Sequence, residues 1–168
     1  LAISGRGRGN GGKAGLYREM DEDNFVLQSV VENMSPVGLC GSALASVADI
    51  TVEDTTNYLD ISFFDDVSLE TVLQADIDRN PLVNLIRVGN EWIQFRTAAP
   101  QTLDSGSPYR SKWRISNLWR GRFNTTTGHS SDEYAAIVTT SLMFYDLDTF
   151  DVGKTITLKA VTAGQDIE

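Results

Sequence analysis

The chain has 168 residues and a formal net charge of −9, with 41% hydrophobic and 22% charged residues. This size predicts one globular domain, alone or with an appendage, that buries roughly two-thirds of its unfolded surface. A single cysteine, Cys40, and a single histidine, His129, exclude an internal disulfide, a CxxC pair and a zinc site built from several such residues. The net acidity argues against nucleic-acid binding, and no apolar run approaches the ~20 residues of a membrane span.

The N-terminal segment is rich in glycine and arginine. Six glycines fall among the eleven residues from Gly5 to Gly15, so residues 1–18 are predicted to form a flexible arm or linker. The segment lacks an initiator methionine and the apolar stretch of a secretory signal, and we therefore expect a fragment or processed piece of a larger protein.

The rest of the chain reads as short β-strands. Strands are predicted over Phe25–Val31, Leu59–Phe64, the region of Trp113 and Ile115, Tyr134–Tyr145 and Thr155–Val161, from their alternating or β-branched and aromatic residues. Val83–Val88 and Glu91–Arg96 flank Gly89-Asn90, which predicts a hairpin with a type II′ turn. The one helical signal is a short turn capped by Ser68, which carries Leu69, Val72 and Leu73 and ends before Pro81.

These patterns predict a mainly β fold, an antiparallel β-sandwich or barrel-like domain with few short helices, formed by residues 19–168 as a single β domain. We expect Ile93, Phe95, Ile115 and Leu118 in its core, and Cys40 as a small buried hydrophobic residue.

Charge is distributed in four blocks along the chain. Residues 1–18 carry +4, residues 19–78 carry −14, residues 79–122 carry +6 and residues 123–168 carry −5. The simpler interpretation is that the blocks neutralise one another inside the fold. The alternative is that they attract a neighbouring subunit or steer a partner.

Several short motifs resemble known binding or catalytic sites, but the residues around them do not fit those sites. Residues 7–12 match GxGxxG, but the helix that such a loop must open is not evident, and Ala14 stands where a phosphate loop needs Ser or Thr. Asp76–Asn80 opens like a calcium loop, but Pro81 and Arg87 exclude an EF-hand. An irregular calcium loop at Asp76 and Asp78, or at Asp146, Asp148 and Asp151, remains an alternative to a solvated acidic turn.

His129, beside Ser130 and Asp132, is predicted to be a surface or loop histidine rather than part of a triad. The residues themselves thus predict no catalytic, cofactor-binding or metal-binding residue.

One stretch carries a specific resemblance. The sequence WRISNLWRGR of residues 113–122 follows NEWIQF of residues 90–95 and precedes Thr127-Gly128-His129. In this order the chain resembles a domain of the large tail-tip proteins of siphophages and gene transfer agents, the J-like host-specificity or "megatron" proteins. The resemblance covers roughly residues 59–165, including the closing Ala163-Gly164-Gln165. It departs from that family where Phe123-Asn124-Thr125 replaces x-Gly-Thr, which leaves the turn geometry open.

The resemblance implies a non-enzymatic structural component of a bacteriophage or phage-like tail tip that contributes to tip assembly and host attachment. Such a protein is located in the virion, after synthesis in the bacterial host cytoplasm. Its expected partners are other tail-tip proteins, copies of itself in a homotrimer, and a host surface glycan or receptor. No cofactor and no catalytic residue carries over. The residues of the structural motif are Glu91, Trp92, Phe95, Leu118, Trp119, Arg120, Gly121 and Arg122.

Two other functions stay open from the residues. Trp92, Trp113 and Trp119 are candidates for glycan contact in a carbohydrate-binding module, although core packing is their simpler role. A carboxylate-based glycosidase requires two carboxyl groups about 5–10 Å apart, one with a raised pKa.

Gly121 is predicted to mark a turn or bulge, and Arg120 to contact an acidic side chain or backbone carbonyls. Phosphate of surface glycans or lipids is the alternative partner of the arginines.

Overall fold

The computed structural model describes residues 2–3, 13–31, 35–125, 127–139 and 143–162, and the chain forms two compact units. Unit 1 comprises Leu1–Ser35 and Thr139–Glu168, and unit 2 comprises Pro36–Val138. The sequence predicted one domain that begins at residue 19, and the division differs from that prediction. Strands from both ends of the chain pair with each other in unit 1, whereas the strands of unit 2 close on themselves.

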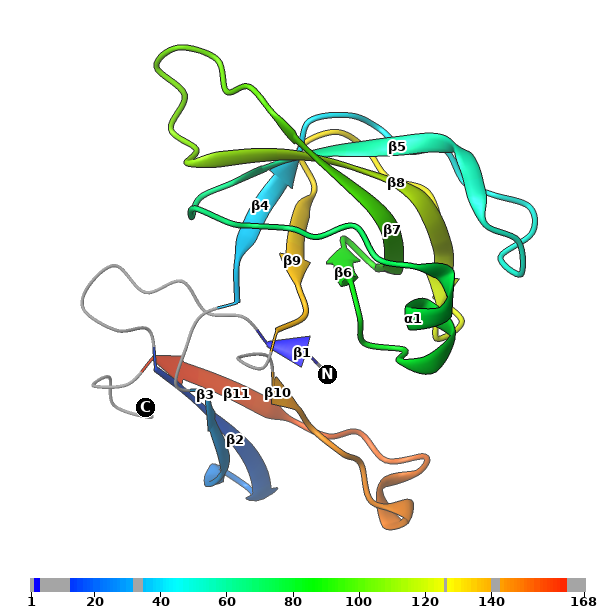
Figure 1. Ribbon diagram of the computed structural model, residues 1–168. Helices are drawn as coiled ribbons and strands as arrows, with labels where there is room; N and C mark the ends of the chain where they lie inside the picture. Colours follow the sequence, from blue (N-terminus) through cyan, green and yellow to red (C-terminus); the bar gives the residue numbers. More distant parts are fainter. Residues whose placement is uncertain (1, 4–12, 32–34, 126, 140–142, 163–168) are drawn as a thin grey trace. The chain divides into compact units, whose positions relative to one another are not determined.

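Unit 2 is a closed antiparallel barrel of six strands in the order β4-β5-β8-β7-β6-β9 (Figure 1). The barrel closes because β9 pairs with both β4 and β6. The strands are β4 (Val37–Cys40), β5 (Asp54–Phe63), β6 (Leu85–Val88), β7 (Glu91–Gln101), β8 (Ser111–Arg122) and β9 (Tyr134–Ile137). The predicted mainly β, barrel-like fold is confirmed.

The hairpin of β6 and β7 has the predicted two-residue turn. Val88 pairs with Glu91, and Gly89 adopts a φ of 49°, which glycine reaches without steric cost. The first strand begins at Leu85 rather than at Val83, because Asn84 also has a positive φ of 47° and interrupts the extended chain. The second strand extends to Gln101, beyond the predicted Arg96.

The barrel interior is filled by the alternate residues that the sequence pattern identified. Leu59, Ile61 and Phe63 of β5 are fully buried. The four residues predicted in the core, Ile93, Phe95, Ile115 and Leu118, are each at most 1% exposed. Cys40 is also buried in this core, and burial raises the pKa of its thiol to about 12, so it behaves as a small hydrophobic residue as predicted.

The helix α1 (Gln74–Arg79) begins later than the turn predicted at Ser68. Thr71 and Val72 are extended because they bond to the part of β7 that β6 leaves uncovered: the Val72 amide donates to the Arg96 carbonyl, and Thr71 bonds to Ala98. The helix starts only after this contact, where the Asp76 carboxylate accepts from the Leu73 amide at 3.0 Å. Within the described residues, no helix is long and apolar enough to cross a membrane.

Unit 1 holds two small antiparallel sheets. One pairs β1 (Ala2–Ile3) with β10 (Met143–Phe144), and the other has the order β11-β2-β3. Its strands are β11 (Leu158–Thr162), β2 (Ala14–Asp21) and β3 (Asn24–Val31), and a 3-10 turn, η1, spans Thr149–Asp151. The Arg18 guanidinium of β2 bonds to the Asp151 carboxylate of η1 at 2.5 and 2.9 Å.

Unit 1 corrects three boundaries predicted from the sequence. The expected strand Tyr134–Tyr145 is two strands, because the chain leaves the barrel after Val138 and β10 belongs to unit 1. The strand expected over Thr155–Val161 begins at Leu158, where pairing with Arg18 starts. Residues 14–18 of the predicted arm lie in β2 because β3 and β11 pair with both of its edges. The GxGxxG match at residues 7–12 and the closing Ala163-Gly164-Gln165 lie outside the described residues.

Candidate functional site

The resemblance motif occupies paired positions on β7 and β8. Trp92 pairs with Arg122, Gln94 with Trp119, and Phe95 with Leu118. Between the first two pairs, Ile93 alone faces both Arg120 and Gly121, so β8 contains one extra residue. Gly121, the second of these two residues, has a φ of 59°, which glycine adopts without steric cost. The predicted bulge at Gly121 is confirmed, within a strand that continues to Arg122.

The side chain of Arg120 is buried inside the barrel and binds Glu91. Its Nε and Nη2 donate to Oε1 and Oε2 of Glu91 at 2.7 and 2.8 Å, and both side chains are 0% exposed. Its Nη1 faces the Ala45 carbonyl at 3.2 Å and Asp54 Oδ2 at 3.4 Å. The predicted contact of Arg120 with an acidic side chain is confirmed.

Glu91 accepts two further hydrogen bonds. The Gly121 amide donates to Oε1 at 2.7 Å, and His129 Nε2 lies 2.7 Å from Oε2. Burial alone raises the pKa of this carboxyl, but the hydrogen bonds from His129, Arg120 and Gly121 outweigh it and lower the pKa to about 2. Glu91 is therefore an ionised carboxylate inside the barrel.

His129 is buried, which corrects the prediction of a surface histidine. It is 9% exposed, and its Nδ1 lies 2.9 Å from Oε2 of Glu133 while Nε2 faces Glu91. Two backbone hydrogen bonds with Leu44, of 2.9 and 2.7 Å, hold its loop against the segment between β4 and β5. Burial alone lowers the pKa of the imidazole, but bonds to Glu91 and Glu133 raise it overall. We call Asp54, Glu91, Arg120 and His129, with the partly exposed Glu133 at their edge, the buried charge cluster.

The outer face of β7 and β8 carries the other polar and aromatic residues of the motif. Paired residues point to the same face of a sheet, as do residues two apart, so Trp92, Gln94, Trp119 and Arg122 share this face. Trp92 and Trp119 are half-buried there. Trp113 instead packs against the core, and its Nε1 donates to the Val67 carbonyl at 2.8 Å. The three tryptophans therefore do not form one stacking surface.

A pocket opens at the end of β8, beside the motif. It has a volume of about 510 Å³ and is lined by Ile50, Thr51, Trp119, Arg120, Gly121, Arg122, Phe123 and Asn124. We call it the outer pocket. The guanidinium of Arg122 has no hydrogen bond or ion pair with any described residue, and the side chain is half-buried.

The chain makes a tight turn after β8, at Phe123-Asn124-Thr125, where the sequence departs from the x-Gly-Thr of the resembled family. Phe123 and Asn124 have φ values of 58° and 59°, and the Thr125 amide donates to the Arg122 carbonyl at 3.4 Å. This is a tight turn with two left-handed residues, a conformation that usually requires Gly or Asn. It leaves the Phe123 ring 59% exposed at the pocket, in edge contact with Trp92 at 6.4 Å between centroids.

The acidic segments considered for calcium serve local roles. Asp76 accepts the Leu73 amide at the start of α1, and Asp148 accepts the Phe150 amide at the start of η1. Asp151 binds Arg18. Across the described part of the chain, no group of three His, Cys, Asp or Glu residues is placed to hold a metal ion.

Sequence reasoning found the two principal partners of the cluster but missed the rest. Glu91, Arg120 and Gly121 belong to the motif, whereas Asp54 and Glu133 carry no local signal among 23 acidic residues. His129 appeared in the resemblance only as the residue that follows Thr127-Gly128. Phe123 was identified as part of the departure from x-Gly-Thr, but its exposure on the surface was not predicted.

Comparison with known proteins places the barrel in a family. The family described as Rcc01698-like, C-terminal, matches residues 35–137, and no curated protein matches the chain. The matched segment runs through all six barrel strands and includes the bulge and the buried charge cluster. Because the match covers more than half of the chain, the protein belongs to the Rcc01698-like C-terminal family.

Proposed function

We propose that the chain is a non-enzymatic structural component of the tail tip of a bacteriophage or phage-like particle, where it contributes to tip assembly and host attachment. The proposal rests on the order of the NEWIQF and WRISNLWRGR segments and the following histidine. In the structure these segments are not scattered: Glu91, Arg120, Gly121 and His129 meet in one buried cluster.

The observation that best supports a scaffolding role is the closure of this cluster. Arg120 and Glu91 are 0% exposed, so neither can reach a soluble substrate in this conformation. A glycosidase needs a carboxyl group with a raised pKa as its acid. Glu91 and Glu133, the two carboxylates that face His129, both have pKa values below their usual range. Hydrogen bonds from His129 and from a backbone amide lower each pKa, and Arg120 lowers that of Glu91 further. The chemistry of the cluster therefore favours stabilisation over catalysis.

The proposal is tested by locating the chain in particles. An epitope inserted at Gly106, in the exposed loop between β7 and β8, leaves the cluster and the outer pocket intact. Immunogold electron microscopy of particles assembled with this chain is expected to label the tail tip. Particles without the epitope serve as the control. Label on the head, or particles that contain none of the chain, would refute the proposal.

A further inference from the structure

We propose that the outer pocket binds an acidic saccharide, a pyranose ring that carries a carboxylate. The inference goes beyond the proposed function and does not depend on it. The pocket lies between the β4–β5 loop, which contributes Ile50 and Thr51, and the end of β8 with its turn. Its volume of about 510 Å³ is within the range of sites for small ligands.

Aromatic rings form the apolar part of the pocket. Trp119 and Phe123 both line it, and Phe123 is 59% exposed. Trp92 packs edge-on against Phe123, and the Arg87 guanidinium lies 5.1 Å from the centroid of Trp92, so the Phe123 ring is supported from one side. A supported, exposed ring suits the apolar C–H face of a pyranose.

The backbone at Phe123 is strained. A bulky residue with a φ of 58° is unusual, and glycine or asparagine would adopt the same turn at lower cost. The exposed ring gains little from burial in return. Strain of this kind is characteristic of residues that clamp ligands, and it indicates that the ring serves a contact outside the fold.

Arg122 supplies the charge. The acids of the β4–β5 loop and of the start of β5 have partners other than Arg122: Glu53 binds Arg96, Asp54 faces Arg120, and Asp49 accepts from the amide and hydroxyl of Thr51. The guanidinium of Arg122 therefore has no acidic partner among the described residues, in a chain of net charge −9. An arginine can hold a carboxylate through two parallel hydrogen bonds.

The combination of groups selects the class of ligand. A neutral sugar would cover the aromatic rings but leave the guanidinium of Arg122 without a partner. Free phosphate would bind the guanidinium but has no apolar face for Trp119 and Phe123. An acidic pyranose satisfies both, and Asn124 and Thr51 offer polar groups to its hydroxyls.

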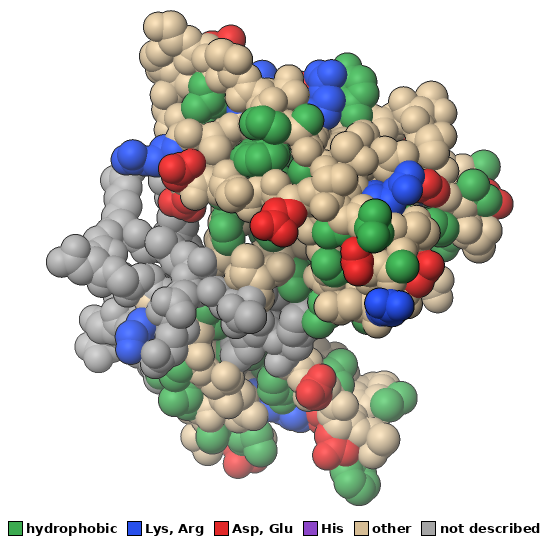
Figure 2. Space-filling model, viewed as in Figure 1, with side chains coloured by type: hydrophobic (Ala, Val, Ile, Leu, Met, Phe, Trp, Pro, Cys, Tyr) green, Lys and Arg blue, Asp and Glu red, His purple; other side chains and the backbone are tan. Residues whose placement is uncertain are grey.

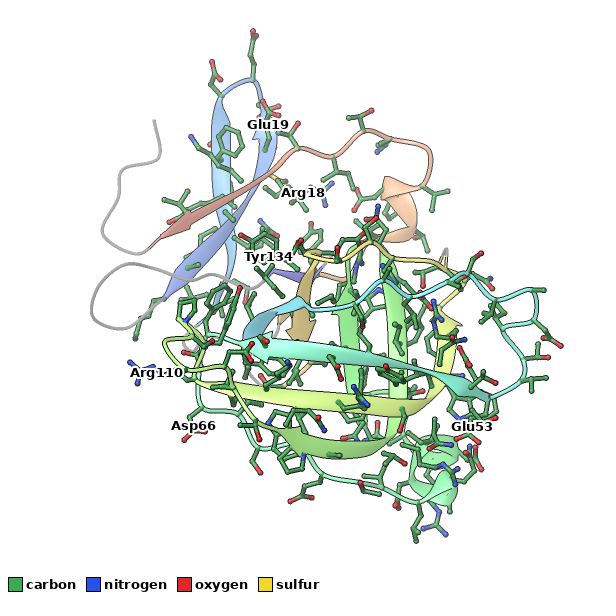
Figure 3. All side chains as sticks on the ribbon, turned by 90° about the horizontal axis from the view of Figure 1, so that it is seen from above. Arg18, Glu19, Glu53, Asp66, Arg110 and Tyr134 are labelled. Atoms are coloured by element: carbon green, nitrogen blue, oxygen red, sulfur yellow. The ribbon has the colours of Figure 1, made fainter. Side chains whose placement is uncertain are left out.

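The first experiment screens the full chain against oligosaccharides that contain uronic or sialic acid residues, each beside its neutral counterpart. Binding is expected only to acidic members, and the strongest of them is titrated by the change in total tryptophan fluorescence, to which Trp92 and Trp113 also contribute. Arg122→Gln is expected to lower that affinity at least tenfold. Arg110→Gln removes the same charge from the exposed residue that precedes β8, at the end of the barrel opposite Glu53 (Figure 3), and is expected to leave the affinity unchanged.

Phe123→Gly separates a contact role from a structural one. Glycine adopts the positive φ freely, so the variant is expected to keep or gain thermal stability while it loses at least tenfold in affinity. Four outcomes would overturn the inference: no acidic oligosaccharide bound, equal binding to the neutral counterparts, full affinity in Arg122→Gln, or competition by inorganic phosphate at the strength of the sugar. None of them changes where immunogold label is found, so failure here is distinct from failure of the tail-tip proposal.

Discussion

At Glu91, charge inside the barrel is balanced around one carboxylate. Arg120, His129 and the Gly121 amide all donate to it, from β8 and from the loop before β9. Isolated buried charges are costly, and a buried pair is tolerated when its geometry is good and its remaining atoms are satisfied. Each of the two carboxylate oxygens of Glu91 accepts two hydrogen bonds. The loss of one partner should therefore cost far more than the pair contributes.

Arg120→Ala is expected to lower the free energy of unfolding by about 3–5 kcal/mol, because it leaves Glu91 charged and buried without its main partner. Urea denaturation measures the loss. Arg114→Ala is the matched control: Arg114 is also on β8 and binds Asp60 through Nε and Nη2, at 2.7 and 2.8 Å, but its side chain is 38% exposed. Its loss is expected to be much smaller. Equal losses in the two variants would contradict the role of burial.

The cluster should also make stability depend on pH in both directions. The pKa of Glu91 falls from 4.5 to about 2 on folding, so its contribution, roughly 3 kcal/mol, is present above pH 4.5 and is lost as the pH falls towards 2. The pKa of His129 rises above 6.5, so its contribution is present below pH 6.5 and is lost as the pH rises through the folded value. Stability should therefore be greatest between about pH 4.5 and 6.5.

Because His129 is the only histidine, its ring protons can be followed without assignment by NMR in untagged protein. A titration midpoint above 6.5 is expected in the folded state. His129→Gln should abolish the loss of stability at higher pH and reduce the acid limb, which the bonds from Arg120 and Gly121 to Glu91 still maintain in part. A midpoint below 6.5 would mean that burial outweighs the two carboxylates, and would contradict the assignment of a charged histidine.

The bulge in β8 follows Arg120, which faces inward like Leu118 two residues before it, and turns the side chain of Arg122 to the outer face. One extra residue opposite Ile93 shifts the alternation of the strand, and the glycine conformation at Gly121 allows the shift. A Cβ added at Gly121 would lie 2.8 Å from Cγ2 of Ile50 and 3.1 Å from the Thr125 carbonyl. The site therefore excludes a side chain both by conformation and by space.

Gly121→Ala is expected to destabilise the fold by more than the ~1–2 kcal/mol of a left-handed alanine, because it adds steric overlap to the strain. Gly106→Ala isolates the strain: Gly106 has a φ of 79°, and nothing lies within 4 Å of its added Cβ. Thermal denaturation of both variants gives the comparison. Losses of equal size would show that the packing at Ile50 relaxes without cost.

Across unit 2, side chains of opposite charge blocks pair with one another, one pair inside the barrel and two partly exposed. Three arginines of the basic block at residues 79–122 bind acids of the block at residues 19–78: Arg96 with Glu53, Arg114 with Asp60 and Arg120 with Asp54. Blue and red side chains accordingly lie beside each other on the face of unit 2 shown in Figure 2. The interpretation that blocks neutralise one another within the fold is confirmed for these three pairs.

Because these charges are paired within unit 2, they are not available to hold copies of the chain together. If the chain forms the homotrimer that the resemblance implies, the contact should bury apolar area and should exceed ~1,000 Å² in total, since exposed ion pairs contribute only ~0–1 kcal/mol each. Sedimentation equilibrium is therefore expected to give a trimer at low and at high salt. A monomer in both conditions would reject self-assembly of this chain. It would leave the tail-tip role to be judged by the particle experiment.

Unit 2 should fold without unit 1. All six barrel strands lie within residues 36–138, and the closed barrel leaves no strand edge that needs a partner. A fragment of these residues is expected to unfold cooperatively and to give a dispersed amide NMR spectrum. A collapsed spectrum with no cooperative transition would show that the barrel depends on unit 1.

Features that depend on near neighbours were predictable from local patterns in the sequence. The alternation of Leu59, Ile61 and Phe63 identified a half-buried strand, and Gly89-Asn90 identified a hairpin, because period and turn chemistry act over a few residues. The Arg120 contact was also predictable, since a buried arginine beside a bulge requires an acceptor.

Features that join residues distant in sequence became visible in the folded structure alone. His129 is buried because its loop bonds to Leu44, 85 positions earlier, and nothing near residue 129 reports that contact. The division into two units depends on strands from the two ends of the chain finding each other. The outer pocket needs Ile50 beside Gly121, and the strain at Phe123 becomes visible only once the turn has closed. Contacts of this separation are set by global packing, which local patterns do not encode.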